Sequence, residues 1–179
     1  MGKIKISKLD AAKRQLETAI RIYFSDGDPV SIHTLVSAAY NIIQDVNKKR
    51  AGKPMLVKEE MLEFVKPEYK NLIRNMFNKA ENFFKHADFD HEKSLDFNPE
   101  LSELLIIDAL SHYYNLTGED APVFKIYRAW YIINKPHMFN FPEETKRMMG
   151  DFNAESIKLL GKSAYFNLIL PSVMKLAGA

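Results

Sequence analysis

The amino-acid sequence predicts an all-α protein, and two observations carry this prediction. Apolar residues recur at helical spacing along nearly the whole chain, and the strict alternation of a strand occurs only in the short segment Lys3 to Ser7. Residues that begin or end helices, namely Gly, Pro, Asn and Asp, separate the periodic segments. We therefore expect a helical bundle of antiparallel long helices with shorter helices at its periphery.

The first half of the chain predicts four helices. Asp28 and Pro29 mark the start of the second, because an acceptor side chain suits the N-cap and a proline suits the first helical position. A basic loop, Lys48 to Pro54, follows that helix, and Pro67 opens the most amphipathic helix of the chain. The expected ranges are 7–24, 28–49, 58–65 and 67–87.

The second half predicts four more helices and begins with Asn98 and Pro99, another cap followed by a proline. We expect Pro171 to kink or end the last helix, since proline has no amide hydrogen to donate. Aromatic residues are frequent here, and we expect them to extend the core rather than form a subunit interface. The expected ranges are 98–116, 123–133, 142–149 and 153–176.

Composition bounds the class of protein. The chain has 179 residues and no cysteine, which predicts one helical domain over residues 1–179 and excludes disulfide scaffolds, thiolate metal sites and cysteine nucleophiles. No segment approaches the ~20 apolar residues of a membrane span. The basic N-terminal residues lack the apolar region of a signal peptide, so we expect a cytoplasmic protein without membrane contact.

Charge is distributed unevenly although the formal net charge is only +2. Residues up to Lys93 carry 17 basic and 13 acidic side chains, whereas the remainder carries 8 and 10. The segment Ser94 to Val123 has six acids and neither Lys nor Arg. This asymmetry keeps RNA among the candidate partners and equally suits packing between the basic and acidic halves of two copies.

The most informative stretch lies late in the helix that Pro67 opens. At 100° per residue, Asn75, Lys79, Asn82 and His86 fall within about 60° of one another, beside the apolar face. A histidine in such a position can transfer protons near neutral pH, with Lys79 offering charge to a phosphate and Asn82 a hydrogen bond. The alternative is structural: Asn82 and His86 bond to a neighbouring helix and Lys79 is solvated.

The spacing Asn82-Phe83-Phe84-Lys85-His86 resembles the R-N-x-x-x-H motif of the HEPN superfamily, helical proteins that include RNA-cleaving toxins. The resemblance implies that His86 acts on the ribose and scissile phosphate across a dimer interface. Glu81 stands where that family has arginine, and Lys79 or Lys85 would have to hold the phosphate instead. Lysine is a poorer bidentate phosphate ligand than arginine, so the resemblance implies weakened cleavage or none.

A second resemblance links two segments to a group of small bacterial proteins without an assigned activity. The segments run from Asp26 to Leu35 and from Asn82 to Asp88. It implies that the start of the second helix and the end of the fourth face each other, which would let His33 and His86 share one site.

His33 lies near the amino end of its helix, where the helix dipole lowers the pKa of a histidine. Together with Tyr40, two turns further along, it predicts one side of a small-ligand pocket that His86 completes. We place Lys85 and Asp88 among the candidate binding residues of the same region. The alternative is a histidine bonded to the neighbouring loop.

Other constellations predict no chemistry. The H-x-D-x-D-H run from His86 to His91 is better explained as a solvated loop than as a metal site, and Asp108 with His112 as a local ion pair. Phosphate-cradling, nucleophile-elbow and zinc-protease motifs are missing from the sequence. We therefore expect neither a metal nor a cofactor.

Three functions remain, and we order them by how well the motif residues suit them. The first is a non-catalytic HEPN-like interaction module with a homodimeric or other protein partner. The second is a HEPN-like, metal-independent ribonuclease in which His86 transfers a proton, Asn82 orients the substrate and Lys79 holds phosphate. The third is a small-ligand binder with a pocket near His33 and His86.

Overall fold

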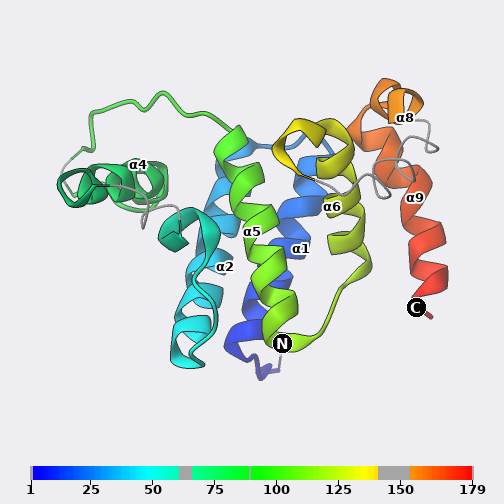
Figure 1. Cartoon of the computed structure of the whole chain (residues 1–179), viewed down its shortest axis with the longest axis horizontal. Coiled ribbons are helices and arrows are strands. Elements are labelled where there is room, and N and C mark those ends of the chain that lie inside the picture. The colour runs from blue at the N-terminus through cyan, green and yellow to red at the C-terminus, as the bar shows by residue number, and fades with distance from the viewer. Residues whose placement is uncertain (1, 61–65, 89, 141–153, 179) are drawn as a thin grey trace. The chain divides into compact units, whose positions relative to one another are not determined.

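The computed structural model confirms the all-α bundle (Figure 1). It describes residues 2–60, 66–88, 90–140 and 154–178, except for the side chains of residues 72–74, 76 and 154. Every element within these residues is helical. The elements are α1 (Lys8–Phe24), α2 (Pro29–Lys49), η1 (Leu56–Glu60), α4 (Pro67–Lys85), α5 (Glu100–Thr117), α6 (Pro122–Asn134), η2 (Pro136–Met138), α8 (Ala154–Leu160) and α9 (Lys162–Leu176).

Contacts group the chain into two compact units. Unit 1 comprises the chain up to Ala19 together with Asp28–Glu119, and unit 2 comprises Ile20–Gly27 and the chain from Asp120 onward. Helix α1 therefore contributes its first turns to unit 1 and its end to unit 2. The single domain over residues 1–179 stays a prediction.

Capping residues set the ends of the helices in unit 1. Asp28 has an extended backbone, and its Oδ2 accepts a hydrogen bond from the Ser31 amide at 2.7 Å, which satisfies one free donor at the start of α2. Asn98 similarly accepts from the Glu100 amide at 3.0 Å. Gly118 ends α5 with a φ of 69°, a left-handed conformation that glycine adopts without steric cost.

Helix α2 is the centre of unit 1. It runs parallel to α5, because His33 contacts Ser102 and Tyr40 contacts Asp108, so residue numbers rise together along both helices. It crosses α4 near the carboxyl end of that helix, since His33 lies against Phe84 and Asn41 against Glu81. The fully buried apolar side chains of this core that are larger than alanine are Leu16, Val36, Tyr40, Ile43, Met55, Val57, Leu105, Ile106 and Leu110.

Unit 2 is built around aromatic rings, which confirms that these residues extend the core. Phe24 at the end of α1 stacks on Phe166 of α9 with ring centroids 4.6 Å apart. Its ring also meets Tyr127, Trp130 and Tyr165, and all of these side chains are less than one-tenth exposed.

Three expected helices differ from the structure or lie outside its described residues. The range 153–176 is divided at Gly161, whose φ of 73° breaks the helix, and α9 continues beyond Pro171 to Leu176, so a helix end at Pro171 is wrong. The helix expected at 58–65 is a π-helical turn that begins at Leu56, and residues 61–65 lie outside the described part, as does the helix at 142–149.

None of the described helices combines the length and the apolar composition that a bilayer crossing requires.

Candidate functional site

A polar cleft of about 670 Å³ opens in unit 1 between α2 and α4. Residues 52–59, which follow α2, form a third wall. Carboxamide and charged side chains dominate the lining, with Phe77 as its one aromatic residue. The lining residues are Asn41, Gln44, Asn47, Lys48, Gly52, Pro54, Lys58, Glu59, Lys70, Phe77, Asn78, Glu81 and Asn82.

The floor of the cleft is a nearly buried ion pair. Lys58 Nζ lies 3.1 Å from Glu81 Oε2, and the two side chains are only 10% and 9% exposed. Asn41 bonds to both partners, and Lys85 lies 2.8 Å from the other oxygen of Glu81. Burial raises the pKa of Glu81, but the hydrogen bond and charge of Lys85 and Lys58 outweigh it and hold that pKa below its ordinary value. The carboxylate is therefore ionised and already neutralised.

Several polar side chains along the same cleft make no hydrogen bond or ion pair among the described residues. They are three carboxamides and one ammonium group, contributed by both helices: Gln44, Asn78, Asn82 and Lys70. The second carboxylate of the lining, Glu59, is paired with Lys48 at 2.9 Å. The groups left to bind a ligand are therefore amides and a positive charge.

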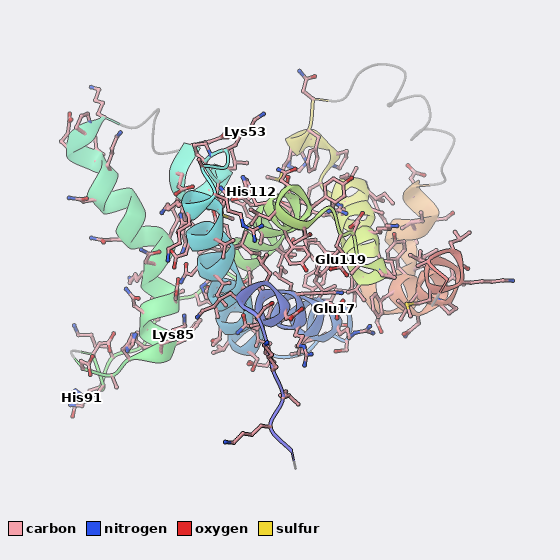
Figure 2. All side chains as sticks on the ribbon, turned by 90° about the horizontal axis from the view of Figure 1, so that it is seen from below. Glu17, Lys53, Lys85, His91, His112 and Glu119 are labelled. Atoms are coloured by element: carbon pink, nitrogen blue, oxygen red, sulfur yellow. The ribbon has the colours of Figure 1, made fainter. Side chains whose placement is uncertain are left out.

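A basic loop borders the cleft where α2 ends. Lys49 and Lys53 belong to it, and neither makes an ion pair among the residues that the structure describes. Figure 2 shows Lys53 beyond the last turn of α2. The lining residue Asn47 donates from its Nδ2 to the Lys53 carbonyl at 2.6 Å. The loop predicted from the sequence thus adds positive potential at one end of the cleft.

The wall between the helices, residues 54–59, is held by a buried polar cluster. Asp108 on α5 accepts hydrogen bonds from the Val57 amide at 3.0 Å and from the Tyr40 hydroxyl at 2.7 Å. The Tyr40 oxygen in turn accepts from the Lys58 amide at 3.3 Å. His112 faces Asp108 with Nδ1 at 3.2 Å, as the expected ion pair, and reaches the Pro54 carbonyl with Nε2 at 3.2 Å.

The structure separates His86 from the helical ridge predicted around it. Helix α4 ends at Lys85, and His86 follows as its C-cap with an extended backbone (φ −132°, ψ 147°). Its side chain is exposed and has no partner among the described residues, and Lys79 is exposed outside the cleft. Asn82 is the ridge residue that lines the cleft. The helical angle does not apply to His86, because the helix stops one residue before it.

The remaining predicted binding residues divide between the interior and the surface. His33 is fully buried, with Nδ1 2.9 Å from Ser102 Oγ and its ring between the edges of Phe84 and Phe97. Burial lowers the pKa of His33 to about 4, so the ring is neutral. Asp88 is exposed in the loop after α4.

The start of α2 and the end of α4 do face each other, because the rings of His33 and Phe84 are 5.8 Å apart. The structure nevertheless places His33 inside the core and His86 on the surface, and neither lines the cleft. Tyr40 is also fully buried and lies behind the cleft wall rather than in the cleft.

Sequence reasoning missed most of the cleft. Its α2 side carries carboxamides at Asn41, Gln44 and Asn47, a spacing of three that places them on one helix face, and Asn78 and Asn82 are four apart on α4. Two carboxamide stripes on amphipathic helices were the available signal. Their meeting depends on how α2 and α4 cross, which the sequence does not state.

Groups of three or more metal-ligating side chains do not occur among the described residues. Comparisons of the chain with protein-family models, with characterised proteins and with solved structures find no significant match. The function must therefore be inferred from the chemistry of the cleft itself.

Proposed function

We propose that this protein is a non-catalytic interaction module, and that the cleft between α2 and α4 binds an extended, acidic segment of a partner protein. The observation that carries the proposal is the state of the lining. Its two carboxylates are already paired with lysines, whereas three carboxamides and the ammonium group of Lys70 have no partner among the described residues.

The lining favours binding over catalysis. General acid–base catalysis needs a group that gains or loses a proton near neutral pH, and no histidine is among the lining residues. Glu81 has a lowered pKa and is held by Lys58 and Lys85. It also occupies the arginine position of the HEPN-like motif, so we propose that the protein is a HEPN-like module that does not cleave RNA.

Unpaired carboxamides match the groups of a peptide backbone. Each side-chain amide offers a donor and an acceptor, and each residue of an extended peptide presents one N–H and one C=O. Gln44 projects into the cleft from α2, and Asn78 and Asn82 from α4. An extended segment between the helices would therefore find amide partners on both sides.

The charged side chains in and beside the cleft indicate the sign of the charge that the partner carries. The lining holds three lysines and two glutamates, and the adjoining loop adds Lys49 and Lys53. Complementary potential favours an acidic partner and accelerates its association. A nucleic-acid strand suits the site less well, because phosphates would lie against Glu59 and Glu81 and most of the lining ammonium groups are already paired.

The direct test is fluorescence anisotropy with a labelled poly-glutamate peptide as probe. We expect binding that Lys70→Glu weakens at least about tenfold, equivalent to about 1.4 kcal/mol. Lys79→Glu is the matched control, because it makes the same charge change on the same helix outside the lining. Equal weakening by both variants would show a general charge effect and reject the cleft.

A second pair of variants tests the carboxamides without changing charge. Asn82→Ala removes a lining amide, and Asn75→Ala removes an exposed amide of α4 that does not line the cleft. We expect weaker peptide binding only for Asn82→Ala. A labelled single-stranded RNA is measured alongside, and tighter binding of RNA than of peptide would overturn the proposed partner class.

A further inference from the structure

The cleft wall takes hydrogen-bond partners for its backbone from α5 and α2. Asp108 accepts hydrogen bonds from the amides of Leu56 at 3.3 Å and Val57 at 3.0 Å. The Lys58 amide donates to Tyr40, whose hydroxyl donates to the same carboxylate. Three successive backbone amides of the wall are thus satisfied by one buried cluster.

His112 closes the cluster at the other end of the wall. Its Nδ1 faces Asp108 Oδ1, and its Nε2 faces the Pro54 carbonyl oxygen, each at 3.2 Å. Both partners are acceptors, so both ring nitrogens must carry hydrogens to satisfy them. A neutral imidazole has a single N–H and leaves one of these two contacts unmade.

We propose that the Asp108–His112 pair is a pH-sensitive clasp, which holds the wall of residues 54–58 against α5 while His112 is protonated and loosens it when His112 loses its proton. The effect of the clasp on binding rests on the proposed function, because Pro54 and Lys58 line the cleft that we propose as the binding site. The clasp would set the shape of the cleft and thereby its affinity for a partner.

The titratable groups of the cluster come from three elements, and Asp108 is the one that acts directly on His112. Asp108 lies on its own helix, Tyr40 approaches from α2, and Glu59 on η1 acts electrostatically on Tyr40. The hydrogen bond to Asp108 raises the pKa of His112 and outweighs burial, which lowers it. Burial raises the pKa of Tyr40, so its hydroxyl keeps its proton.

The sign of the pH dependence follows from these directions. A raised pKa in the folded state means that the contribution of His112 is complete below its ordinary value of 6.5 and is lost as the pH rises through the raised value. Burial raises the pKa of Asp108, but the hydrogen bonds from His112, Val57 and Tyr40 outweigh it and hold that pKa below its ordinary value of 3.8. The carboxylate therefore keeps its negative charge down to a pH below 3.8. The wall is therefore held most firmly in mildly acidic solution.

The test uses NMR on the intact chain without a ligand. The imidazole signals of His112 are followed with pH, together with amide hydrogen exchange at Val57, corrected for the intrinsic pH dependence of exchange. We expect His112 to titrate above 6.5 and Val57 protection to fall about tenfold or more through that titration. The Ile43 amide, in the core of α2, is the internal reference and should not change.

Substitutions separate the clasp from general stability. Asp108→Asn keeps the shape of the side chain and removes its charge, so we expect the His112 pKa to fall and Val57 protection to decrease. Asp96→Asn, at an exposed position before α5, is the matched control and should change neither. If Asp108→Asn also lowers the protection of the Ile43 amide, the substitution has destabilised the protein as a whole. The clasp is then judged from the pH titration of the wild-type protein alone.

Two results would overturn the clasp. One is Val57 protection that stays constant while His112 titrates, and the other is a fall that Ile43 shares equally. Because these readouts involve no ligand, they are independent of the peptide test. If Val57 protection follows the His112 titration but the acidic peptide does not bind, the proposed partner is rejected and the clasp is kept. If the peptide binds but Val57 protection stays constant, the clasp is rejected and the proposed partner is kept.

Discussion

His33 shows how completely its surroundings change the chemistry of a side chain. As a residue near a helix start it suggested a proton-transfer or binding group, yet its ring is fully buried between Phe84 and Phe97. Its Nε2 has no hydrogen-bond partner among the described residues, so protonation would place a charge in the core that the charge of Glu81 offsets only in part. Its lowered pKa therefore makes it a source of acid sensitivity.

We predict that acid destabilises the protein through His33. With a folded pKa of about 4 against the ordinary 6.5, the unfolded chain binds a proton that the folded chain does not. Stability falls as the pH drops from 6.5 toward 4, by about 3 kcal/mol. Urea unfolding at several pH values should show a smaller loss in His33→Gln than in wild type.

The control for this measurement is His91→Gln. The His91 side chain is 71% exposed in the loop after α4 (Figure 2), so its removal should leave the pH profile unchanged. His112 acts in the opposite direction, because its pKa is raised, and its effect is common to all three proteins. Equal pH profiles for His33→Gln and wild type would contradict the prediction.

At the same scale, Asn82 and His86 were predicted as partners on one helix face and differ in the structure. Asn82 lines the cleft, whereas His86 lies past the helix end. The sequence shows no breaker after Lys85 that would fix this boundary, because glycine and proline are missing until Pro99. A shift of one or two residues at a helix end was enough to move the motif histidine out of the site.

Among the helices, α5 supports the cleft from behind its wall, since it holds Asp108 and His112 and packs along α2. Its end is fixed by Gly118, where φ is 69° and no atom blocks the position of a side chain. The obstacle to substitution is therefore the backbone conformation and not space.

We predict that Gly118→Ala lowers the free energy of unfolding by about 1 kcal/mol, because an L-residue with a side chain is strained in the left-handed region. Gly118→Asn should cost less, since asparagine tolerates that conformation better. Thermal unfolding followed by circular dichroism measures both. Equal costs for the two variants would indicate a lost contact instead of backbone strain.

Element ends were predictable where a local rule sets them. The N-cap and proline at Asp28 and Pro29, and the glycine at Gly118, act through hydrogen bonds and dihedral angles within a few residues, and the first two were identified from the sequence. Gly161 obeys the same rule and was overlooked inside an apolar run. The π-helical turn at Leu56 has no such rule, because Asp108 and Tyr40 stabilise it from other helices.

For the molecule as a whole, the decisive question is whether it cleaves RNA. The proposed function predicts that the purified protein shows no cleavage of single-stranded RNA above background, with or without a chelator, and that His86→Ala behaves identically. The physical reason is that His86 is exposed, has no charged partner among the described residues and does not line the cleft. Gel analysis of labelled RNA measures this outcome.

Cleavage by wild type that His86→Ala abolishes would reject the non-catalytic proposal and favour the HEPN-like ribonuclease. Because His86 is exposed, the substitution should leave the thermal unfolding midpoint unchanged, so a loss of activity could not be attributed to unfolding. Residual cleavage common to both proteins would point to a contaminating nuclease and leave the non-catalytic proposal in place.

Sequence alone determined the fold class, most helix ends and the basic loop after α2, because periodicity, capping and charge runs act over a few neighbouring residues. Only the tertiary structure decided which polar residues meet. Asn41, Lys58 and Glu81 are separated by up to 40 residues and converge on the cleft floor, and Asp108 reaches the wall across 51. Burial also determined which polar side chains are paired, because a charged group removed from water needs a hydrogen-bond or ionic partner. Those partners come from distant parts of the chain, so a pattern of neighbouring residues does not identify them.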